Sequence, residues 1–319
     1  YDSLLVKVTS WDCTFPAVCR KATRAINEEH RNPRYLSDYR LPSAIRATAE
    51  YAAACDGAEA VVIVTPSAAL RSVAADLREL VAPATPIVIC SKGVEEKTGL
   101  LPIDTFAAEL GGAGRMAVLS GPTHAEEVIC RKPSAAVVAS ADEGTALFFR
   151  DLFATRFFRT YTSDDPVGVE LCAAFKNVIA IAVGISYGMG FGDNTAAMLI
   201  TRGLAEMSRM VVAAGGEALT CMGLGGAGDM VVTCMSQHSR NRRFGEQYVA
   251  RGLTLDDFTA QTHMVVEGAI ACKTLATLEA RYGVDLPLTD TVRSVVWEGV
   301  NPREAAAALI DRPLKSEFY

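Results

Sequence analysis

The stretch that decides the fold lies at residues 164–186 and reads DDPVGVELCAAFKNVIAIAVGIS. Asp164 or Asp165 can cap a helix at its start, and Pro166 suits the first helical position, where no backbone N–H is required. Alanine, leucine, isoleucine and valine dominate the remainder, so most of the circumference of this helix must be buried. We therefore predict one long core helix.

Lys176 stands in the middle of this helix and is followed by Asn177. Residues three and four positions from a helical residue lie on its face. For Lys176 these neighbours are all apolar: Cys172, Ala173, Ile179 and Ala180. Such a lysine either extends its ammonium to the surface or is held in a site where desolvation lowers its pKa. Residues further along the chain favour the buried site.

The composition limits the classes of function. A chain of 319 residues with 50% hydrophobic content can bury two cores, which predicts two domains. A net charge of −6 and a pI near 5.4 argue against nucleic-acid binding. The nine cysteines include no CxxC pair, which indicates reduced thiols in a cytosol-like compartment. We expect a cytoplasmic protein, with a plastid as the alternative.

The sequence has no pattern typical of a metal site or of a membrane span. The four histidines (His30, His124, His238 and His263) lack the spacing of metal ligands, so we expect no metal site. No apolar run approaches the length of a membrane span, and the start, YDSLLVKVTS, lacks the layout of a signal peptide.

Residues 1–162 alternate short β-rich runs with helical ones, which indicates a parallel sheet covered on both faces. From residue 163 onward the pattern is helical, so we predict domains at 1–162 and 163–319. The expected helices lie at residues 16–29 and 67–80, and the expected strands at 4–11, 60–65, 87–90, 116–119 and 135–139.

In such sheets, ligands bind where strands end and helices begin. The residues at those positions are Asp12, Pro66, Ser67, Ser91, Lys92, Gly93, Ser120, Gly121, Pro122 and Thr123. Lys92 can face a ligand there, or it can be an ordinary surface lysine.

A dinucleotide site on this fold requires GxGxxG directly after the first strand, but no glycine precedes Gly57. A formal match occurs at Gly223, Gly225 and Gly228, among helical segments and without a preceding buried strand. We interpret that match as a close-packed helix start.

Three further groups of polar residues suggest chemistry. Asp229 and Thr233 are four residues apart and would share a helix face, either in a site or as a cap and a core threonine. The run SRNRRFG at residues 239–245 can bind a phosphate dianion, although such runs also form solvated basic faces. Glu267 follows two valines and could hold a cofactor or cap a helix.

Together these segments resemble NAD(P)-dependent glycerol-3-phosphate dehydrogenases from NPRYL, at residues 32–36, to the C-terminus. The matching motifs are SKG, LSGPTHAEEV, DDPVGVELCAAFKNVIAIAVGI, DNTAAMLITRGLAEM, MGLGGAGDMVVTC, SRNRRFG and VVEG. The resemblance implies a Rossmann-like sheet domain followed by an all-helical domain. It also implies reversible reduction of dihydroxyacetone phosphate to sn-glycerol 3-phosphate, and we expect a homodimer.

The resemblance also assigns roles to individual residues. Lys176 would be the general acid and base, assisted by Asp229 and Lys92. The substrate would be bound by Lys92, Thr123, Asn177, Asp229, Thr233, Ser239, Arg240 and Asn241. The cofactor, NAD with NADP as the alternative, would be bound by Asp12, Tyr35, Pro66, Lys92, Gly121, Ala125, Arg240, Val265 and Glu267.

Two departures from the family pattern matter. The opening strand and glycine turn of the nucleotide domain are missing, so we expect both upstream of Asp2 in the natural protein. His124 stands where the family pattern suggests an apolar or amide side chain, and a neutral spectator is favoured over a ligand of the cofactor. A carboxylate at Asp12 would repel a 2′-phosphate, which favours NADH over NADPH.

Two other functions remain open at this point. One is a related two-domain dehydrogenase of another hydroxy acid, which would not require the SRNRRFG cluster. The other is a non-catalytic relative with a degraded cofactor site, against which the joint presence of Lys176, Asp229 and Arg240 argues.

Overall fold

The computed structural model describes residues 15–32, 37–314 and 316–317. Asp12, Tyr35 and the strand expected at residues 4–11 lie outside these described residues. The elements of the N-terminal half are α1 (Phe15–Asn27), α2 (Tyr51–Cys55), β1 (Val61–Ile63), α3 (Leu70–Leu77), β2 (Ile87–Ile89), α4 (Pro102–Leu110), β3 (Met116–Ser120), α5 (Ala125–Val128), β4 (Ser134–Ala139), α6 (Glu143–Phe153) and β5 (Phe158–Ser163).

The described strands form one sheet in the order β1-β2-β3-β4-β5. The pairs β1–β2, β2–β3 and β4–β5 are parallel, as the sequence predicted, but β3 and β4 are antiparallel, with Val118 opposite Ala139. The expectation of a wholly parallel sheet is therefore wrong at one pair. The connection between β3 and β4 contains only the four-residue helix α5, and antiparallel neighbours need no long crossover.

Strand β5 was not predicted from the sequence. Its residues, FRTYTS, are mostly polar and lack the continuous apolar run by which the other strands were recognised. The strand pairs with β4 alone among the described strands and therefore forms an edge of the sheet. An edge strand can pair with a single neighbouring strand and stay largely exposed, so its sequence shows little of the apolar pattern that predicts a strand.

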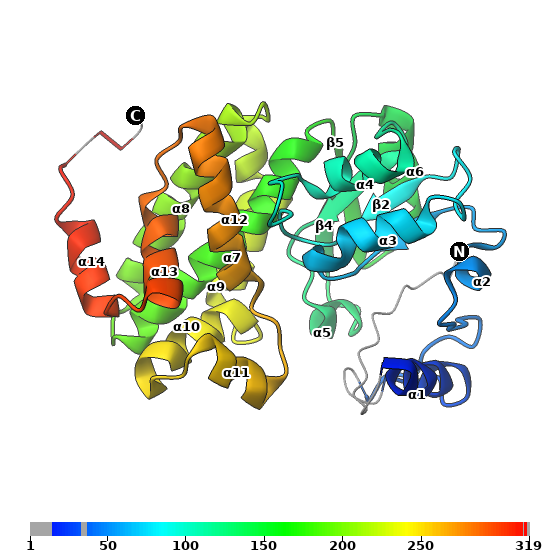
Figure 1. Ribbon diagram of the computed structural model, residues 1–319, viewed down its shortest axis with the longest axis horizontal. Coiled ribbons are helices and arrows are strands. Elements are labelled where there is room, and N and C mark those ends of the chain that lie inside the picture. The colour runs from blue at the N-terminus through cyan, green and yellow to red at the C-terminus, as the bar shows by residue number, and fades with distance from the viewer. Residues whose placement is uncertain (1–14, 33–36, 315, 318–319) are drawn as a thin grey trace.

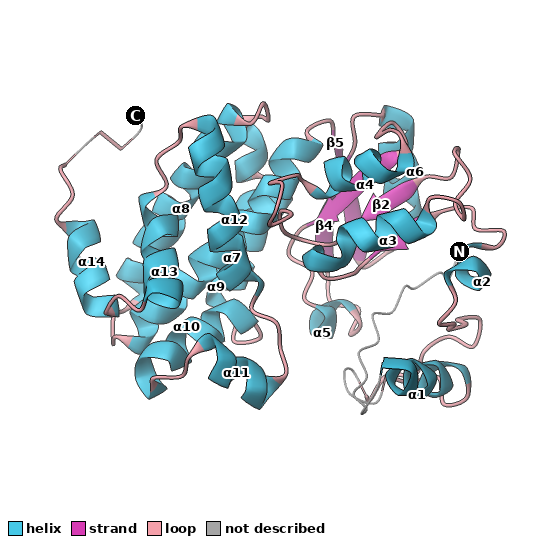
Figure 2. Cartoon of the chain, in the orientation of Figure 1, coloured by secondary structure: helices cyan, strands magenta, loops and turns pink. Residues whose placement is uncertain are grey.

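Helices cover both faces of the sheet, as expected from its apolar strands (Figure 2). Ile87 and Ile89 of β2 pack with Phe106 of α4 and with α3 on one face. Val88, which points the opposite way, packs with Phe149 of α6 on the other face. This alternation follows from the two-residue period of a strand.

Helix α7 (Pro166–Gly188) lies at the centre of the C-terminal half, as Figure 1 shows. The predicted core helix is confirmed, because every residue from 168 to 186 is buried and the Asp165 side chain accepts a hydrogen bond from the N–H of Gly168 at 2.8 Å. The surrounding helices are α8 (Asp193–Ala213), α9 (Asp229–Met235), α10 (Arg240–Arg251), α11 (Leu255–Thr262), α12 (Glu267–Tyr282), α13 (Pro287–Glu298) and α14 (Pro302–Ile310).

One expectation about membranes needs correction. Helix α7 has 23 residues and a mean hydropathy of 1.7 over its most apolar window, so by length and composition it could cross a membrane. That whole window is buried inside the protein. The apolar character of α7 therefore belongs to a core helix enclosed by other helices.

Two glycines allow α7 and α10 to approach closely. A Cβ atom added at Gly184 would lie 2.1 Å from the carbonyl oxygen of Arg242, and one added at Gly245 would lie 2.3 Å from that of Ile181. Any side chain at either position would force the helices apart. This contact fixes the N-terminal turn of α10, which begins at Arg240, beside α7.

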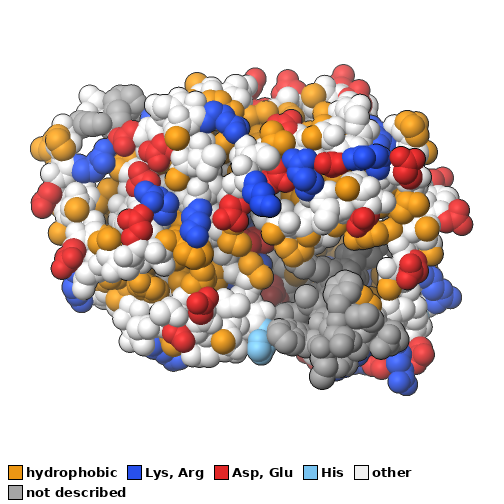
Figure 3. Space-filling model, in the orientation of Figure 1, with side chains coloured by type: hydrophobic (Ala, Val, Ile, Leu, Met, Phe, Trp, Pro, Cys, Tyr) orange, Lys and Arg blue, Asp and Glu red, His pale blue; other side chains and the backbone are white. Residues whose placement is uncertain are grey.

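Positive and negative side chains are interspersed over the face shown in Figure 3, in keeping with the modest net charge of −6.

The predicted domain boundary between residues 162 and 163 falls between the last two residues of β5. It stays a prediction.

Candidate active site

The buried amine of Lys176 is the centre of the candidate site. Its Nζ donates hydrogen bonds to Oδ1 of Asp229 at 2.6 Å and to Oγ1 of Thr233 at 3.0 Å. The residue is only 6% exposed, which excludes a surface lysine. The Thr233 hydroxyl donates its own hydrogen bond to the backbone carbonyl of Asp229 at 2.6 Å, so its oxygen can accept from the amine. Since an ammonium has three N–H groups, one remains available on Lys176.

Lys92 approaches the same carboxylate from the sheet. It follows β2, and its Nζ donates to Oδ2 of Asp229 at 2.7 Å. The two lysines thus bind opposite oxygens of one aspartate, which joins the loop after β2 to helices α7 and α9. Oγ of Ser120, at the end of β3, lies 3.5 Å from Oδ2. Ser120 was named among the strand-end positions in the sequence, but no catalytic or binding role was assigned to it.

Burial and the two neighbouring charges set the ionisation of this cluster. Desolvation and the charge of Lys92 together lower the pKa of Lys176 to about 8, although Asp229 opposes both effects. Burial alone would also lower the pKa of Lys92, but the charge and hydrogen bond of Asp229 outweigh it and raise that pKa. Burial would raise the pKa of Asp229, yet the two ammonium groups hold it below its usual value. Lys176 is therefore the amine that can exchange a proton near neutral pH.

A pH profile follows from this lowered pKa. A general acid must be protonated, so kcat/KM for ketone reduction should fall as the pH rises through about 8, the pKa of Lys176. The reverse oxidation needs the neutral amine and should rise through the same pH. Initial rates in both directions, at saturating cofactor, check this expectation. A reduction rate that stays flat up to pH 10 would contradict it.

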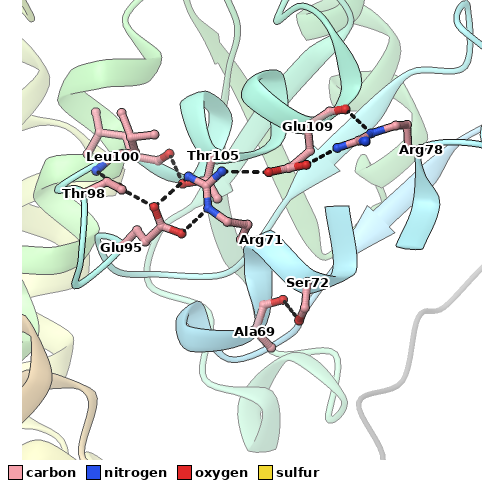
Figure 4. A network of polar contacts seen from close by, with 10 residues as sticks. Ala69, Arg71, Ser72, Arg78, Glu95, Thr98, Leu100, Thr105 and Glu109 are labelled. Carbon is pink, nitrogen blue, oxygen red and sulfur yellow. Dashed lines mark hydrogen bonds and ion pairs between the residues drawn. The ribbon is translucent and has the colours of Figure 1, made fainter. Parts of the chain in front are cut away.

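The loop that carries Lys92 is anchored by an ion-pair network (Figure 4). The Arg71 guanidinium on α3 donates to both oxygens of Glu95, at 2.7 and 2.8 Å, and to Glu109 on α4 at 2.8 Å. A bidentate contact of this kind fixes orientation as well as distance. Gly93 has a φ of +142°, a conformation that glycine adopts without strain. The network and the glycine together hold Lys92 towards Asp229.

The two predicted asparagines meet beside Lys176, and their side chains are engaged with each other. Nδ2 of Asn241 donates to Oδ1 of Asn177 at 2.9 Å, and its Oδ1 accepts from the N–H of Gly268 at 2.9 Å. These bonds connect α7, α10 and the start of α12. At most one N–H of Asn241 remains for a ligand.

Ser239 and Arg240 begin α10. Oγ of Ser239 caps the helix by accepting from the N–H of Arg242 at 3.3 Å. Arg240 is half-buried and has no hydrogen-bond or ion-pair partner within the described part of the chain. The first N–H groups of a helix also lack intrahelical partners and attract anions. The start of α10 can thus receive a phosphate group.

The residues expected at the cofactor lie around the same region. Pro66 follows β1, Ala125 begins α5, and Glu267 begins α12, where its charge acts on Lys92. Val265 is 47% exposed in the preceding loop. Thr123 lies in the turn after β3, where its Oγ1 donates a hydrogen bond to the carbonyl of Gly121 at 3.2 Å.

Two residues beyond the strand ends are notable. Gly121 has a φ of +150°, and a Cβ added there would lie 2.9 Å from the carbonyl oxygen of Ala135, so the turn after β3 packs on β4 too closely for a side chain. Just after β1, Oγ1 of Thr65 is buried and has no hydrogen-bond partner among the described residues. A buried hydroxyl is normally paired, so this one suits a ligand polar group.

The GxGxxG match at Gly223, Gly225 and Gly228 is not a loop between a strand and a helix. Residues Leu224–Gly228 form a π-helical turn that continues into α9. A Cβ at Gly226 would lie 2.2 Å from the carbonyl oxygen of Cys221, which confirms the close-packed helix start.

The comparisons with known proteins agree over nearly the whole chain. Residues 5–146 match the family model described as the NAD-dependent glycerol-3-phosphate dehydrogenase N-terminus, and residues 165–307 match the corresponding C-terminus. A glycerol-3-phosphate dehydrogenase [NAD(P)+] of Oleidesulfovibrio alaskensis is 45% identical over 309 residues, which cover 96% of this chain and 93% of the relative. One from Streptomyces griseus is 45% identical over 298 residues, covering 93% and 88%.

A solved structure from the same family is similar over most of the chain. The crystal structure of glycerol-3-phosphate dehydrogenase from Coxiella burnetii superposes with a TM-score of 0.87 at 36% identity, covering 91% of this chain and 88% of that one. Matching family models, sequence identity and backbone geometry thus coincide with a lysine–aspartate–lysine cluster beside a nucleotide-binding sheet. The chain therefore belongs to the NAD-dependent glycerol-3-phosphate dehydrogenase family.

Proposed function

We propose that this protein catalyses the reversible, NAD(P)H-dependent reduction of dihydroxyacetone phosphate to sn-glycerol 3-phosphate. The observation that carries the proposal is the remaining N–H of Lys176, on an amine that Asp229 and Thr233 hold in place. A spectrophotometric assay tests it by following NADH oxidation on addition of dihydroxyacetone phosphate. Absence of turnover with either NADH or NADPH would refute the proposal.

Lys176 acts on the carbonyl oxygen of the substrate. When the nicotinamide cofactor is bound, it supplies the hydride for the carbonyl carbon. Negative charge then develops on the oxygen, and the Lys176 ammonium stabilises that charge and transfers its proton. Lys92 keeps its proton, because Asp229 raises its pKa, and adds positive potential at the same place.

Arg240 binds the phosphate at the far end of the substrate. Its guanidinium and the N–H groups at the start of α10 supply donors for phosphate oxygens, with Ser239 and Asn241 nearby. The energy of binding this remote group holds the carbonyl beside Lys176. Such a phosphate site favours dihydroxyacetone phosphate over the unphosphorylated hydroxy acids of other two-domain dehydrogenases.

Replacement of Arg240 by alanine should lower kcat/KM for dihydroxyacetone phosphate about ten- to a hundredfold, because hydrogen bonds to charged groups contribute roughly 1.5–3 kcal/mol each. The slow reaction with unphosphorylated dihydroxyacetone should barely change. Arg251→Ala, at the other end of α10, is the matched control and should behave as wild type. Equal losses on both substrates would show that Arg240 is structural.

The remaining expectations extend this proposal. Selection of NADH over NADPH rests on Asp12, which lies outside the described residues, and stays a prediction. We also propose that the protein works in the cytoplasm as a homodimer on its small-molecule substrate. Its family membership supports the substrate class, and light scattering of the purified protein measures the subunit number.

A further inference from the structure

His124 carries a buried polar atom that the proposed mechanism does not use. The residue directly precedes α5 and follows the Gly-Pro-Thr turn at the end of β3. Its Nε2 is buried and has no hydrogen-bond partner in the described part of the chain. The centroid of its ring lies 6.3 Å from that of His238, which stands between α9 and α10. His124 therefore extends from the sheet domain towards the helical domain.

Charged groups of the candidate site interact with this imidazole. Lys176 on α7 and Asp229 on α9 both act on its charge, as does Glu126 on its own helix. The backbone carbonyl of Val232 faces the ring. Because Nε2 has no partner, we assign this carbonyl to Nδ1, which leaves Nε2 free for a ligand.

On its other side, His124 is close to the start of α10. Its neighbour His238 directly precedes Ser239 and Arg240, the proposed phosphate site. A substrate that extends from Lys176 to Arg240 would thus bring its phosphate into the neighbourhood of His124. With the proton of Nδ1 directed at a carbonyl, Nε2 can accept a hydrogen bond from a hydroxyl when the ring is neutral, or donate one to an anion when it is an imidazolium.

We propose that His124 binds the substrate phosphate as an imidazolium, donating a hydrogen bond from Nε2 and completing from the sheet domain the phosphate site that α10 begins. A buried polar atom without a partner is unfavourable, and a phosphate dianion can supply a partner for Nε2 once the ring is protonated. The sequence had favoured a spectator role for this histidine. The inference rests on the proposed function of the same site.

A linkage between binding and pH follows. In the free enzyme, burial and the charge of Lys176 lower the pKa of His124, while Glu126, Asp229 and the Val232 carbonyl partly oppose them. A bound dianion raises that pKa again, so substrate binding should take up a proton. The contribution of His124 to affinity should therefore increase as the pH falls from about 8 to about 6.

Two variants separate the ring from its charge. His124→Phe keeps the aromatic shape without nitrogen, and His124→Gln keeps a permanent N–H that does not titrate. KM and kcat for dihydroxyacetone phosphate and for dihydroxyacetone are measured at several pH values, and melting temperatures show that each variant is folded. Dividing each KM by that of His124→Gln at the same pH removes the titration of the phosphate and of Lys176.

For His124→Phe, KM for dihydroxyacetone phosphate should rise about tenfold or more near pH 6 and less near pH 8, since a charge-assisted hydrogen bond is lost only where the ring is charged. The kcat values and the rate with dihydroxyacetone should change little. The wild-type KM divided by that of His124→Gln should fall as the pH falls. His238→Gln, the exposed neighbour, should keep the wild-type pH dependence.

Other outcomes overturn the inference. An unchanged KM in folded His124→Phe at every pH would return His124 to a spectator, and a raised KM for NADH alone would assign it to the cofactor. A loss of affinity that grows with pH would mean that neutral Nε2 accepts from a substrate hydroxyl. Absence of wild-type turnover with dihydroxyacetone phosphate would instead refute the proposed function, so the two failures are distinguishable.

Discussion

Replacement of Lys176 by methionine is expected to lower kcat by a factor of about 10²–10⁴, the range that positioned acid–base groups contribute. The amine is the group that can both stabilise the developing charge and transfer a proton, because desolvation brings its pKa to about 8. Methionine matches the shape of the lysine stem, and Asp229 keeps its bonds to Lys92 and Ser120. The fold and the affinity for NADH should therefore be nearly unchanged.

The measurement is kcat with the melting temperature and the NADH dissociation constant of the same variant. Lys176→Arg is a useful companion, because its guanidinium retains the charge but does not release its proton at working pH. It should be almost as slow as the methionine variant if proton transfer dominates. A methionine variant that keeps most of its kcat would assign Lys176 a purely structural role.

Replacement of Asp229 by asparagine should cause the largest combined loss of activity and stability. The change leaves two buried ammonium groups facing one neutral amide, where the wild type has Lys92 and Lys176 on opposite oxygens of one carboxylate. Removing one partner of a buried ion pair typically costs about 3–5 kcal/mol. The midpoint of urea denaturation, at the pH of maximal wild-type stability, measures this loss.

The same substitution should also shift the pH dependence of catalysis. Without the aspartate charge, desolvation and Lys92 lower the pKa of Lys176 unopposed, so the protonated form disappears at a lower pH. The fall in kcat/KM for reduction should therefore begin below the wild-type value. Asp164→Asn, an exposed aspartate just before α7, is the control and should alter stability by no more than about 0.5 kcal/mol. A destabilised Asp229→Asn enzyme with an unmoved pH profile would separate Asp229 from catalysis.

Much of this protein could be predicted from local patterns in its sequence. The apolar run around Lys176, with a cap at Asp165, was enough to predict a buried helix, because burial of a whole circumference is visible in composition. The four-residue spacing of Asp229 and Thr233 predicted a shared helix face, which the structure has. The continuous apolar strands predicted a sheet that helices cover on both faces, and the structure has such a sheet. The polar strand β5 and the direction of β4 were missed, because neither leaves a local apolar signal.

Only the tertiary structure decided how the site is assembled. Lys92 and Lys176 are 84 positions apart by their residue numbers, and no periodicity shows that they meet on opposite oxygens of Asp229. Nor could the sequence show that the side chain of Asn241 is engaged with Asn177. Periodicity reports which face of an element is buried, whereas distances between elements depend on packing contacts such as that of Gly184 against α10. The ionisation of Lys176 depends on those distances, so the sequence determined which groups are present and the fold determined which of them can exchange a proton.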